Sequence, residues 1–394
     1  MAVVLSRHEH PIVTGAFPRA WPLSLARLTL QDFRNYTSLR LDLGPGPVVL
    51  TGPNGAGKTN LLEALSLLTP GRGLRRARLR DLDRKGGGAW AVAAALRAPD
   101  GPVEVGTGRV EGSESERRAV RIEGEPARGP SALAEVSSCI WLTPAMDRLL
   151  ADSAAPRRRF LDRLVFTLEP EHAARVAGYE HALRERGRLL RRQQGDGEWL
   201  TALEARAAKL GVAIASARRR LLAGLSRAID KAETAFPRPG LALRGRIETW
   251  LGTEAEADVE RRIVEGLAAG RGRDAETGGA GIGPHRSDLL VEDVDLGQPA
   301  ERSSTGRQKA LLIAIVLAET RLRGRAGAAL PLLLLDEVIA HLDAERRDAL
   351  FAEIRALGAQ AWLTGTDADL FRPLAGSAQF FHVRDATVHA TSQA

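Results

Sequence analysis

The chain has 394 residues, a length that predicts two or three domains with enough apolar side chains for buried cores. With 44% hydrophobic and 27% charged residues, the composition excludes a disordered chain, and the longest apolar run, residues 310–318, is too short to cross a bilayer. The formal net charge is +7, and only five of the 56 basic residues are lysines. This excess of arginine favours a nucleic-acid partner only weakly, because high genomic GC content produces the same bias.

The single cysteine, Cys139, excludes an intramolecular disulfide and a cysteine-based zinc site. Together with the lack of a spanning segment, it predicts a cytoplasmic protein without a membrane partner. Residues 1–22 contain three prolines and no periodicity, which predicts a flexible N-terminal leader.

Strand patterns begin at residue 23. Leu25, Leu28 and Leu30 precede Phe33, the leucines at 39, 41 and 43 alternate with polar residues, and residues 48–51 form a short apolar strand. Between residues 85 and 142, short apolar segments are separated by glycine-rich turns at hairpin spacing. We predict a small antiparallel sheet there, which closes with a strand at residues 139–142.

The next region, residues 156–236, is helical by pattern and rich in arginine. Leucine, isoleucine and alanine recur between residues 200 and 221 at spacings of three and four, which predicts helices packed side by side in a bundle. A glycine-rich stretch at 266–283 predicts an exposed loop. A helix from about residue 308, a strand at 332–335, a helix to 357 and a strand at 361–363 follow, so the fold class is α/β.

A phosphate-binding loop is the strongest signal in the chain, because it lies between the strand at 48–51 and a helix with one leucine face. It matches the pattern G-x-x-x-x-G-K-[ST] and reads Gly52-Pro53-Asn54-Gly55-Ala56-Gly57-Lys58-Thr59. The glycines let backbone amides turn toward phosphates, Lys58 is expected to reach the β- and γ-phosphates, and Thr59 is expected to ligate Mg²⁺.

Two acids, Asp336 and Glu337, end the apolar strand at 332–335. We expect Asp336 to hold the magnesium and Glu337 to activate the attacking water as general base. Asparagine occurs only at positions 35, 54 and 60, so the N-K-x-D motif that reads guanine is absent and ATP is the expected nucleotide.

Residues 303–309, read as SSTGRQK, precede an apolar helix and resemble the signature segment of ABC-type ATPases. In that segment a serine and helix amides bind the γ-phosphate held by the opposite subunit, which is the role expected of Ser304. The usual form is L-S-G-G-Q. Arg307 stands at the glutamine position, and its role is left open.

In combination, five segments resemble the RecF family of bacterial DNA repair ATPases, which are related to the structural-maintenance-of-chromosomes proteins. They are residues 32–36 (DFRNY), 52–68, 157–162 (RRRFLD), 283–289 (GPHRSDL) and 304–312. The resemblance covers nearly all of residues 23–383. Asn60, directly after the phosphate loop, is specific to that family in combination with the GPHR segment, and the resemblance implies that it belongs to the nucleotide-binding residues. For His285 within that segment, a functional role and a plain packing role remain equally open.

The resemblance implies an ABC-type head with an antiparallel subdomain, built from residues 23–150 and 266–394, and an inserted helical lobe at 151–265. Two molecules would enclose two ATP molecules, with DNA across the paired heads. Partners implied are RecR and RecO, which help to load RecA at single-strand gaps. Asp343 matches a loop that communicates across the dimer, and Arg34 matches a contact to the nucleotide. Thr143 and Thr364 stand where a glutamine and a histidine are usual, which implies slow, DNA-stimulated ATP hydrolysis.

Two alternatives stay open on the residues alone: the cytosolic ATPase subunit of an ABC transporter, and a binding scaffold that has lost turnover. The arginine-rich insert and the GPHR segment argue against the first, and the intact Glu337 argues against the second. An insert of about 110 residues disfavours a chromosome protein with long coiled-coil arms. Three arginine clusters, at 72–80, 184–192 and 218–220, are candidates for DNA contact, and the sequence does not choose among them.

Overall fold

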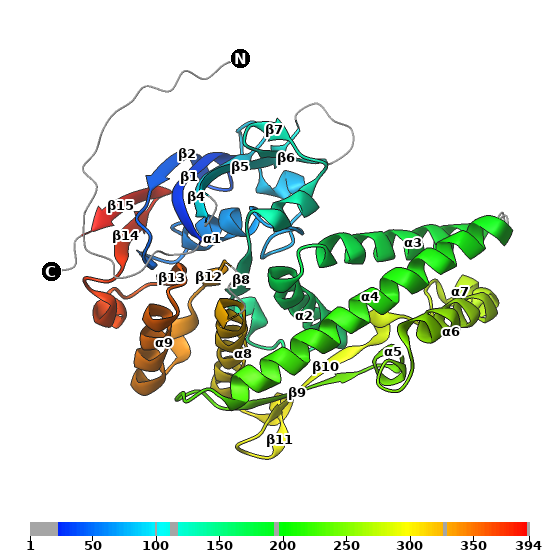
Figure 1. Cartoon of the computed structure of the whole chain (residues 1–394). Helices are drawn as coiled ribbons and strands as arrows, with labels where there is room; N and C mark the ends of the chain where they lie inside the picture. The colour runs from blue at the N-terminus through cyan, green and yellow to red at the C-terminus, as the bar shows by residue number, and fades with distance from the viewer. Residues whose placement is uncertain (1–22, 99–100, 111–116, 193–196, 326–328, 392–394) are drawn as a thin grey trace.

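The computed structural model describes residues 23–98, 101–110, 117–192, 197–325 and 329–391. The predicted leader at 1–22 lies outside these ranges. Two six-stranded sheets form a head, and a long helical hairpin projects from it as an arm (Figure 1). In the described part of the chain, no helix combines the length and apolarity needed to span a bilayer.

The central sheet of the head is parallel except for one edge strand. In spatial order its strands are β15 (Thr387–Thr391), β14 (Gln379–Arg384), β3 (Val48–Thr51), β13 (Ala361–Gly365), β12 (Leu332–Leu335) and β8 (Cys139–Leu142). The four strands from β3 to β8 are buried on both faces, which is typical of a sheet covered on each side. The predicted strands at 48–51, 332–335 and 361–363 are therefore confirmed.

The prediction that residues 139–142 close the antiparallel sheet is wrong. Strand β8 pairs in parallel with β12, with Cys139 opposite Leu332 and Leu142 opposite Leu335. All four β8 residues are apolar and buried, so the segment has no polar face that could have assigned it to a half-exposed antiparallel sheet.

The second sheet is antiparallel throughout, in accord with the alternating patterns near both of its ends. Its order is β2 (Tyr36–Asp42), β1 (Ser24–Phe33), β4 (Ala91–Ala98), β5 (Gly101–Arg109), β6 (Arg118–Ile122) and β7 (Glu125–Pro126). Helix α1 (Lys58–Ser66) shares one hydrophobic core with this sheet and with one face of the central sheet. The helix that follows the phosphate loop is thereby fixed between two layers.

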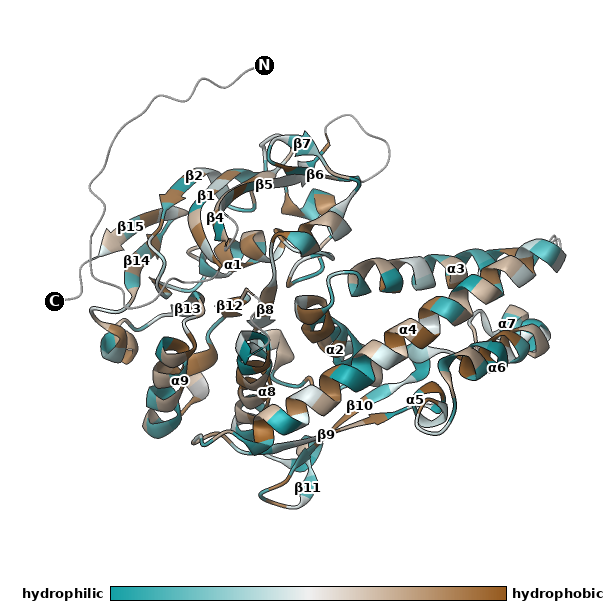
Figure 2. Cartoon of the chain, viewed as in Figure 1, coloured by the Kyte–Doolittle hydropathy of each residue, from teal (hydrophilic) through white to brown (hydrophobic). Residues whose placement is uncertain are grey.

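The opposite face of the central sheet packs on α8 (Thr305–Arg325), α9 (Ala344–Leu357) and α2 (Ala154–Leu168). Strand β3 shows why both cores are needed, since Val48 and Leu50 point into the first core and Val49 into the second. Figure 2 shows apolar residues concentrated where these helices face the sheet.

The arm consists of α3 (His172–Arg192) and the 34-residue helix α4 (Gly197–Asp230), which packs on α3 and on α6 (Glu256–Ala269). The predicted repeat at 200–221 lies on α4, where Leu200, Ala207 and Leu221 are buried. At the arm's base, β9 (Pro239–Arg244), β10 (Asp288–Asp293) and β11 (Gln298–Pro299) form a small sheet, next to α5 (Arg246–Trp250).

The exposed loop predicted at 266–283 is only partly correct. Helix α6 continues to Ala269 and α7 (Arg271–Thr277) follows, so half of the stretch is helical. Helix α6 continues past Gly266 because one of its faces is buried, through Val259, Ile263 and Leu267. The proposed domain boundary at residue 265 falls within this helix, and the domain limits remain a proposal.

Candidate functional site

The phosphate loop begins where β3 ends and finishes at the first residue of α1. Gly52 and Gly57 have φ angles of 143° and 120°, which side chains rarely permit. A Cβ on Gly52 would lie 2.1 Å from the Val383 carbonyl oxygen, and one on Gly57 would lie 2.5 Å from the Tyr36 hydroxyl. Both glycines are therefore required by the packing of β14 and β2 against the loop.

Lys58 is buried beneath this loop, although it is a charged residue. Its Nζ donates hydrogen bonds to the carbonyl oxygens of Gly52 at 2.6 Å and Pro53 at 3.0 Å. Burial lowers the pKa of Lys58, while the nearby carboxylates of Glu337 and Asp336 act in the opposite direction. The tip of the loop, Pro53 to Gly55, is exposed, so the lysine lies between a solvent-facing loop and two acids.

The two acids predicted from the sequence are brought to the loop by the parallel pairing of β12, β13 and β3. Thr59 Oγ1 donates to Asp336 Oδ1 at 3.0 Å, across 277 residues of sequence. Thr364, on β13 between the two strands, donates to the same oxygen at 2.8 Å and accepts from the Glu337 amide at 2.8 Å. These four residues form one hydrogen-bonded group at the carboxyl edge of the sheet.

Burial is the main influence on the Asp336 carboxyl and raises its pKa, although hydrogen bonds from Thr364 and Thr59 favour the ionised form. Glu337 adopts the left-handed backbone conformation, with φ of 50°, and is half-buried. A non-glycine residue in that conformation is uncommon and costs free energy, so the neighbouring bonds must hold it in place.

A second group links the segment 32–36 to the loop. Asn35 Nδ2 donates to the Ala56 carbonyl at 3.2 Å, and Asn60 Nδ2 donates to Asn35 Oδ1 at 2.7 Å. Arg75 continues the chain with a 2.6 Å bond to Asn60 Oδ1. Asn60, expected on family grounds to be close to the nucleotide, therefore supports the inner side of the loop.

Arg34 contacts helix α1 through Glu63. Its Nε donates to Glu63 Oε2 and its Nη2 to Glu63 Oε1, each at 2.8 Å. Arg75 also reaches Glu63, at 2.9 Å, and the Glu63 side chain is 1% exposed. A contact between Arg34 and a nucleotide stays a prediction, since this bidentate pair occupies the guanidinium here.

The signature segment forms the N-terminus of α8. Ser304 is exposed, and its hydroxyl accepts the Arg307 amide at 3.4 Å as a weak helix cap. The Arg307 guanidinium binds the buried carboxylate of Asp293 through two nitrogens, and Ser303 donates to Asp293 at 3.0 Å. At the position where glutamine is usual, the arginine therefore clasps the signature turn to β10.

Asp343 has a comparable place at the start of α9. It is exposed, caps the helix by accepting the Arg346 amide at 2.8 Å, and pairs with the Arg346 side chain at 3.1 Å. The hydrogen bonds of Ser304 and Asp343 are thus local to α8 and α9. Neither shares one with the phosphate loop in the described chain.

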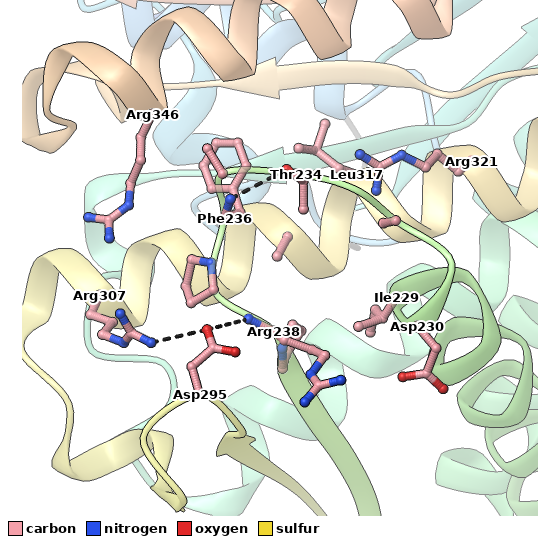
Figure 3. A pocket seen from close by; sticks show the side chains of 15 residues that line it. Ile229, Asp230, Thr234, Phe236, Arg238, Asp295, Arg307, Leu317, Arg321 and Arg346 are labelled. Carbon is pink, nitrogen blue, oxygen red and sulfur yellow. Dashed lines mark hydrogen bonds and ion pairs between the residues drawn. The ribbon is translucent and has the colours of Figure 1, made fainter.

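A cavity of about 390 Å³ opens beside the signature segment, between α8, α9 and the segment that joins α4 to β9 (Figure 3). Asp295 links two sides of this cavity. Its Oδ2 accepts a hydrogen bond from Arg307 Nη2 at 3.2 Å and another from the Arg238 amide at 3.1 Å. Arg346, which pairs with Asp343, lines the same cavity. The base of the arm therefore contacts α8, next to Ser304, and the cavity separates it from the start of α9.

The segment RRRFLD meets the segment GPHRSDL where the arm joins the head. Arg157 binds Asp288 through two bonds of 2.9 and 2.8 Å, and Arg158 donates to the Ser287 carbonyl at 2.7 Å. Two segments whose bonded residues are 129 to 131 positions apart in the sequence thus interlock.

Asp162 is the centre of this joint. Burial disfavours its charge, but Arg218, at 2.8 Å to both oxygens, and His172, at 3.0 Å, hold its pKa below the usual range. Arg218 also donates to the Pro284 carbonyl at 2.7 Å. Helices α2, α3 and α4 are thereby tied to the GPHR turn by one buried ionic group.

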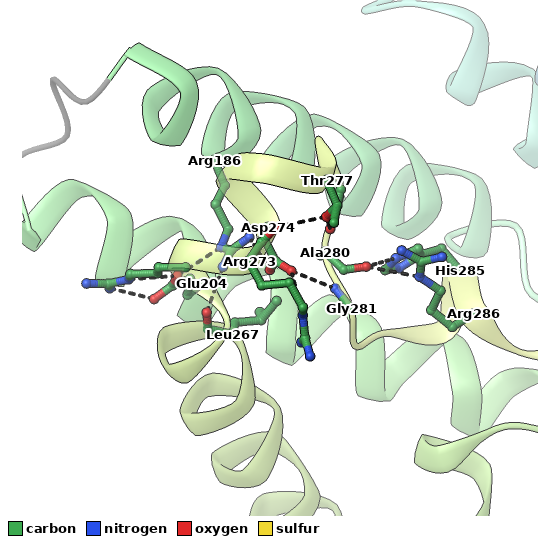
Figure 4. Close-up of polar contacts among 12 residues, drawn as sticks. Arg186, Glu204, Leu267, Arg273, Asp274, Thr277, Ala280, Gly281, His285 and Arg286 are labelled. Atoms are coloured by element: carbon green, nitrogen blue, oxygen red, sulfur yellow. Dashed lines mark hydrogen bonds and ion pairs between the residues drawn. The ribbon is translucent and has the colours of Figure 1, made fainter.

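His285 belongs to the joint and the arm rather than to the phosphate loop. Its Nδ1 lies 2.7 Å from the Tyr179 hydroxyl and its Nε2 lies 2.9 Å from the Ala280 carbonyl. Burial lowers its pKa, so the neutral ring is favoured. Of the two roles left open by the sequence, packing fits these contacts (Figure 4).

Further along the arm, Figure 4 shows a buried ionic network between α3, α4 and α7. Arg186, 2% exposed, donates to Glu204 and Asp274 at 2.9 Å each and to the Leu267 carbonyl at 2.6 Å. Arg271 pairs with Glu204 as well, at 2.6 Å. The two candidate DNA-contact clusters at 184–192 and 218–220 thus contain arginines that already form ion pairs within the protein, among them Arg186 and Arg218.

The residues near the loop fit a magnesium–nucleotide pair. Thr59 and Asp336 place a hydroxyl and a carboxylate oxygen side by side, the oxygen ligands that Mg²⁺ takes together with substrate phosphates. The glycine conformations turn the loop backbone around the start of α1, as phosphate binding requires. Among the described residues, no group of three or more His, Cys, Asp or Glu could hold a metal by itself.

Thr364 is not among the site residues predicted from the sequence, because a histidine is usual at its position. Glu63, Asn35 and Arg75, which contact α1 and the loop, are not predicted either. Glu63 in the run 59–64 offered one signal, since it is an acid on the apolar side of an otherwise buried helix.

Comparisons with known proteins agree with this geometry. Residues 24–388 match the family model described as the RecF/RecN/SMC N terminal domain. The DNA replication and repair protein RecF of Mesorhizobium japonicum is 50% identical over 373 residues, which cover 94% of this chain and 98% of the relative. The RecF of Rhizobium etli is 47% identical over 369 residues, covering 93% and 98%.

Solved structures show the same fold. The recombination mediator protein RecF with ATP, from the RecFOR pathway, superposes with a TM-score of 0.79 at 21% identity and covers 94% of this chain and 100% of that chain. An Smc head domain from Pyrococcus furiosus gives a TM-score of 0.54 at 16% identity, covering 94% and 96%. The predicted ABC-type head is confirmed. Because half of the residues are shared with a curated relative almost from end to end, and because the loop, the acid pair and the joint all lie within the family match, this chain belongs to the RecF family.

Proposed function

We propose that this protein is an ATP-dependent DNA-binding protein of replication and recombinational repair, which binds ATP, closes into a dimer on DNA and hydrolyses ATP to release it. The observation that carries the proposal is the hydrogen-bonded group of Thr59, Asp336, Thr364 and Glu337 at the mouth of the phosphate loop. It combines an oxygen pair for a metal with a second acid in position to act on water.

Each residue has a distinct task in this proposal. The amides of residues 52–59 and the Lys58 ammonium would bind the β- and γ-phosphates, so Lys58 would exchange its bonds to Gly52 and Pro53 for phosphate oxygens. Thr59 and Asp336 would hold magnesium, which supplies positive charge to the phosphate oxygens when bound. Glu337 would orient the attacking water and accept its proton, with its backbone fixed by the Thr364 hydroxyl.

A second copy of the chain would complete the site. Ser304 and Asp343 are both exposed, both stand at the N-terminus of a helix, and both make only local bonds. Helix N-termini favour anions, so the exposed start of α8 suits a phosphate that belongs to another molecule. We infer that ATP joins two heads, with each Ser304 facing the nucleotide of its partner.

The task in the cell is inferred from relatives. Curated proteins at 47% to 50% identity are named DNA replication and repair proteins, and a solved RecF is described as a recombination mediator of the RecFOR pathway. We propose the same task here, with RecO and RecR as partners and the loading of RecA at single-strand gaps as the outcome. The net charge of +7 is compatible with DNA as a partner.

Sedimentation of the Glu337→Gln protein with fluorescent gapped DNA tests the proposal. Removing the general base should keep ATP bound, so we expect a dimer on DNA with ATP and free monomer without it. The Lys58→Ala protein is the matched control and should form no dimer at the same ATP concentration. A dimer with ATP but without bound DNA, or a monomer that ignores ATP, would contradict the proposal.

A further inference from the structure

Four arginines gather where the loop after α1 meets helix α2, at the inner corner between the head and the arm. We call Arg72, Arg76, Arg159 and Arg163 the corner arginines. Arg72, Arg76 and Arg159 are exposed, and Arg163 is half-buried. Figure 1 shows α2 at the place where the head joins the arm, beside the start of α3.

The arginines of helix α2 form two pairs that face different strands. Arg157 and Arg158 turn toward β10 and are engaged in the joint by Asp288 and the Ser287 carbonyl. Arg159 and Arg163 are four residues apart and therefore lie on one face of the helix. That face points toward β8, where the Arg163 guanidinium carbon lies 3.5 Å from the centroid of the Trp141 ring. The tryptophan fixes one corner arginine by a cation–π contact.

The corner arginines are close enough to repel one another. Burial, together with the charges of Arg76 and Arg159, lowers the pKa of Arg163 to about 9. The pKa of Arg76 is lowered as well, first by partial desolvation and then by the charges of Arg159 and Arg72. Arg76 has Glu180 nearby, but that carboxylate pairs with Arg184 at 3.5 Å.

Counter-ions are lacking at this corner. Across the described chain, the side chains of Arg72, Arg76 and Arg159 form no hydrogen bond or ion pair, and Arg163 has only a 3.5 Å bond to the Trp141 carbonyl. Most other buried or half-buried arginines of this protein have a carboxylate or several carbonyls. A cluster of like charges without internal partners costs free energy unless an external anion neutralises it.

The loop that carries Arg72 and Arg76 is held in shape. Arg118, on β6, donates to the carbonyls of Leu67, Thr69 and Gly71 directly before it. Arg76 itself has a left-handed backbone, with φ of 55°. The guanidinium groups are thus presented from a fixed turn rather than from a free chain.

We propose that Arg72, Arg76, Arg159 and Arg163 form a binding site for phosphates of the DNA backbone. Guanidinium forks match phosphate oxygens, and consecutive phosphates would separate the four positive charges. This inference rests on the proposed function, since it names the surface through which the protein would contact DNA. In the clusters on α3 and α4, by contrast, Arg186 and Arg218 are committed to internal ion pairs.

The test compares two double variants that lose the same charge. Arg76→Ala/Arg159→Ala removes two corner arginines, and Arg261→Ala/Arg372→Ala removes two exposed arginines that pair only with Asp258 and Asp369 on their own helices. Fluorescence anisotropy of a labelled gapped duplex is recorded with ATP at increasing salt. Affinity falls with salt, and each lost phosphate contact makes the negative slope of log affinity against log salt shallower by about 0.9. The slope of the corner variant should therefore be shallower by about 2, and its affinity at 0.1 M salt roughly 10- to 100-fold lower.

The control variant should keep the wild-type slope, and Arg76→Lys/Arg159→Lys should recover most of it, because lysine retains the charge. Equal slopes for the corner and control variants would overturn the site while leaving DNA binding intact. If the corner variant lost affinity for a fluorescent ATP analogue but kept its affinity for DNA, the phosphates would be those of a nucleotide and the proposal would be wrong. A wild-type protein that binds no DNA would instead refute the proposed function, and the site with it.

Discussion

Gly52 and Gly55 lie in the same loop and have positive φ angles, but their surroundings differ. An added Cβ at Gly52 would meet the Val383 carbonyl, whereas nothing lies within 4 Å of one at Gly55. Gly52→Ala should therefore destabilise the head by roughly 3 kcal/mol or more and abolish nucleotide binding, and Gly55→Ala should cost only about 1 to 2 kcal/mol. Urea unfolding and titration with a fluorescent ATP analogue measure both, and equal losses would show that the contact with β14 is unimportant.

Glu319 on α8 gives a prediction on pH. Burial raises its pKa to about 7, despite a hydrogen bond from Thr167 on α2. The folded state therefore holds this proton more tightly than the unfolded state, and stability should fall as the pH rises from about 5 to 8 and then level off. The shift from 4.5 to about 7 corresponds to about 3 kcal/mol.

The Glu319→Gln variant is the control, because a neutral amide keeps the acceptor for Thr167 and cannot ionise. Urea unfolding at pH 5 and pH 8 should show a decrease of about 2 to 3 kcal/mol in the wild type that is missing from the variant. The same decrease in both proteins would assign the pH dependence to other groups.

At the scale of the element, the signature turn depends on an ion pair that joins α8 to β10. Asp293 is 0% exposed, and Arg307 provides both of its charged contacts. Arg307→Ala would leave this carboxylate buried without a cation, so we expect a loss of about 2 to 3 kcal/mol in stability and weaker ATP-dependent dimerisation. Adding Asp293→Asn should recover part of the stability. If the single variant unfolded like the wild type, the clasp would not be what holds Ser304 in place.

The elements show where sequence patterns suffice. The strand–loop–helix at 48–66 and the helix that holds the signature were predicted because their chemistry and periodicity are local. Residues 139–142 were assigned to the wrong sheet, because a wholly apolar strand does not reveal its neighbour. Thr364 could not be predicted as a bridge between Asp336 and Glu337, since its role arises only when β13 lies between β3 and β12.

On the scale of the whole molecule, the arm is held to its form by the network around Arg186. Arg186→Met would leave Glu204 and Asp274 buried with fewer cations, and we expect the arm to lose about 3 to 5 kcal/mol in stability. Limited proteolysis should then cut α3 and α4 faster, while the head keeps its affinity for ATP. Arg184→Ala, on the exposed side of α3, should change neither the stability of the arm nor its rate of proteolysis. Loss of ATP binding along with the arm would show that head and arm unfold together.

The family match decides between the DNA-repair interpretation and the transporter alternative, and it spans the joint as well as the phosphate loop. Phosphate loops and acid pairs are shared by many ATPases, so they predicted a chemistry and not a family. The interlocked segments at 157–162 and 283–289 are the more specific signal, but their purpose in connecting arm and head could be seen only in three dimensions.

The bond between Thr59 and Asp336 spans 277 residues, so the ribosome must make most of the chain before the ATP site can exist. At roughly 5 to 20 residues per second, that interval is on the order of 15 to 55 s. During it, α1 and β3 have been made but lack the strands β12, β13 and β14 that cover them. The nascent head therefore exposes apolar surface for much of its synthesis, and a chain interrupted before residue 336 would carry a phosphate loop without the two acids that end β12.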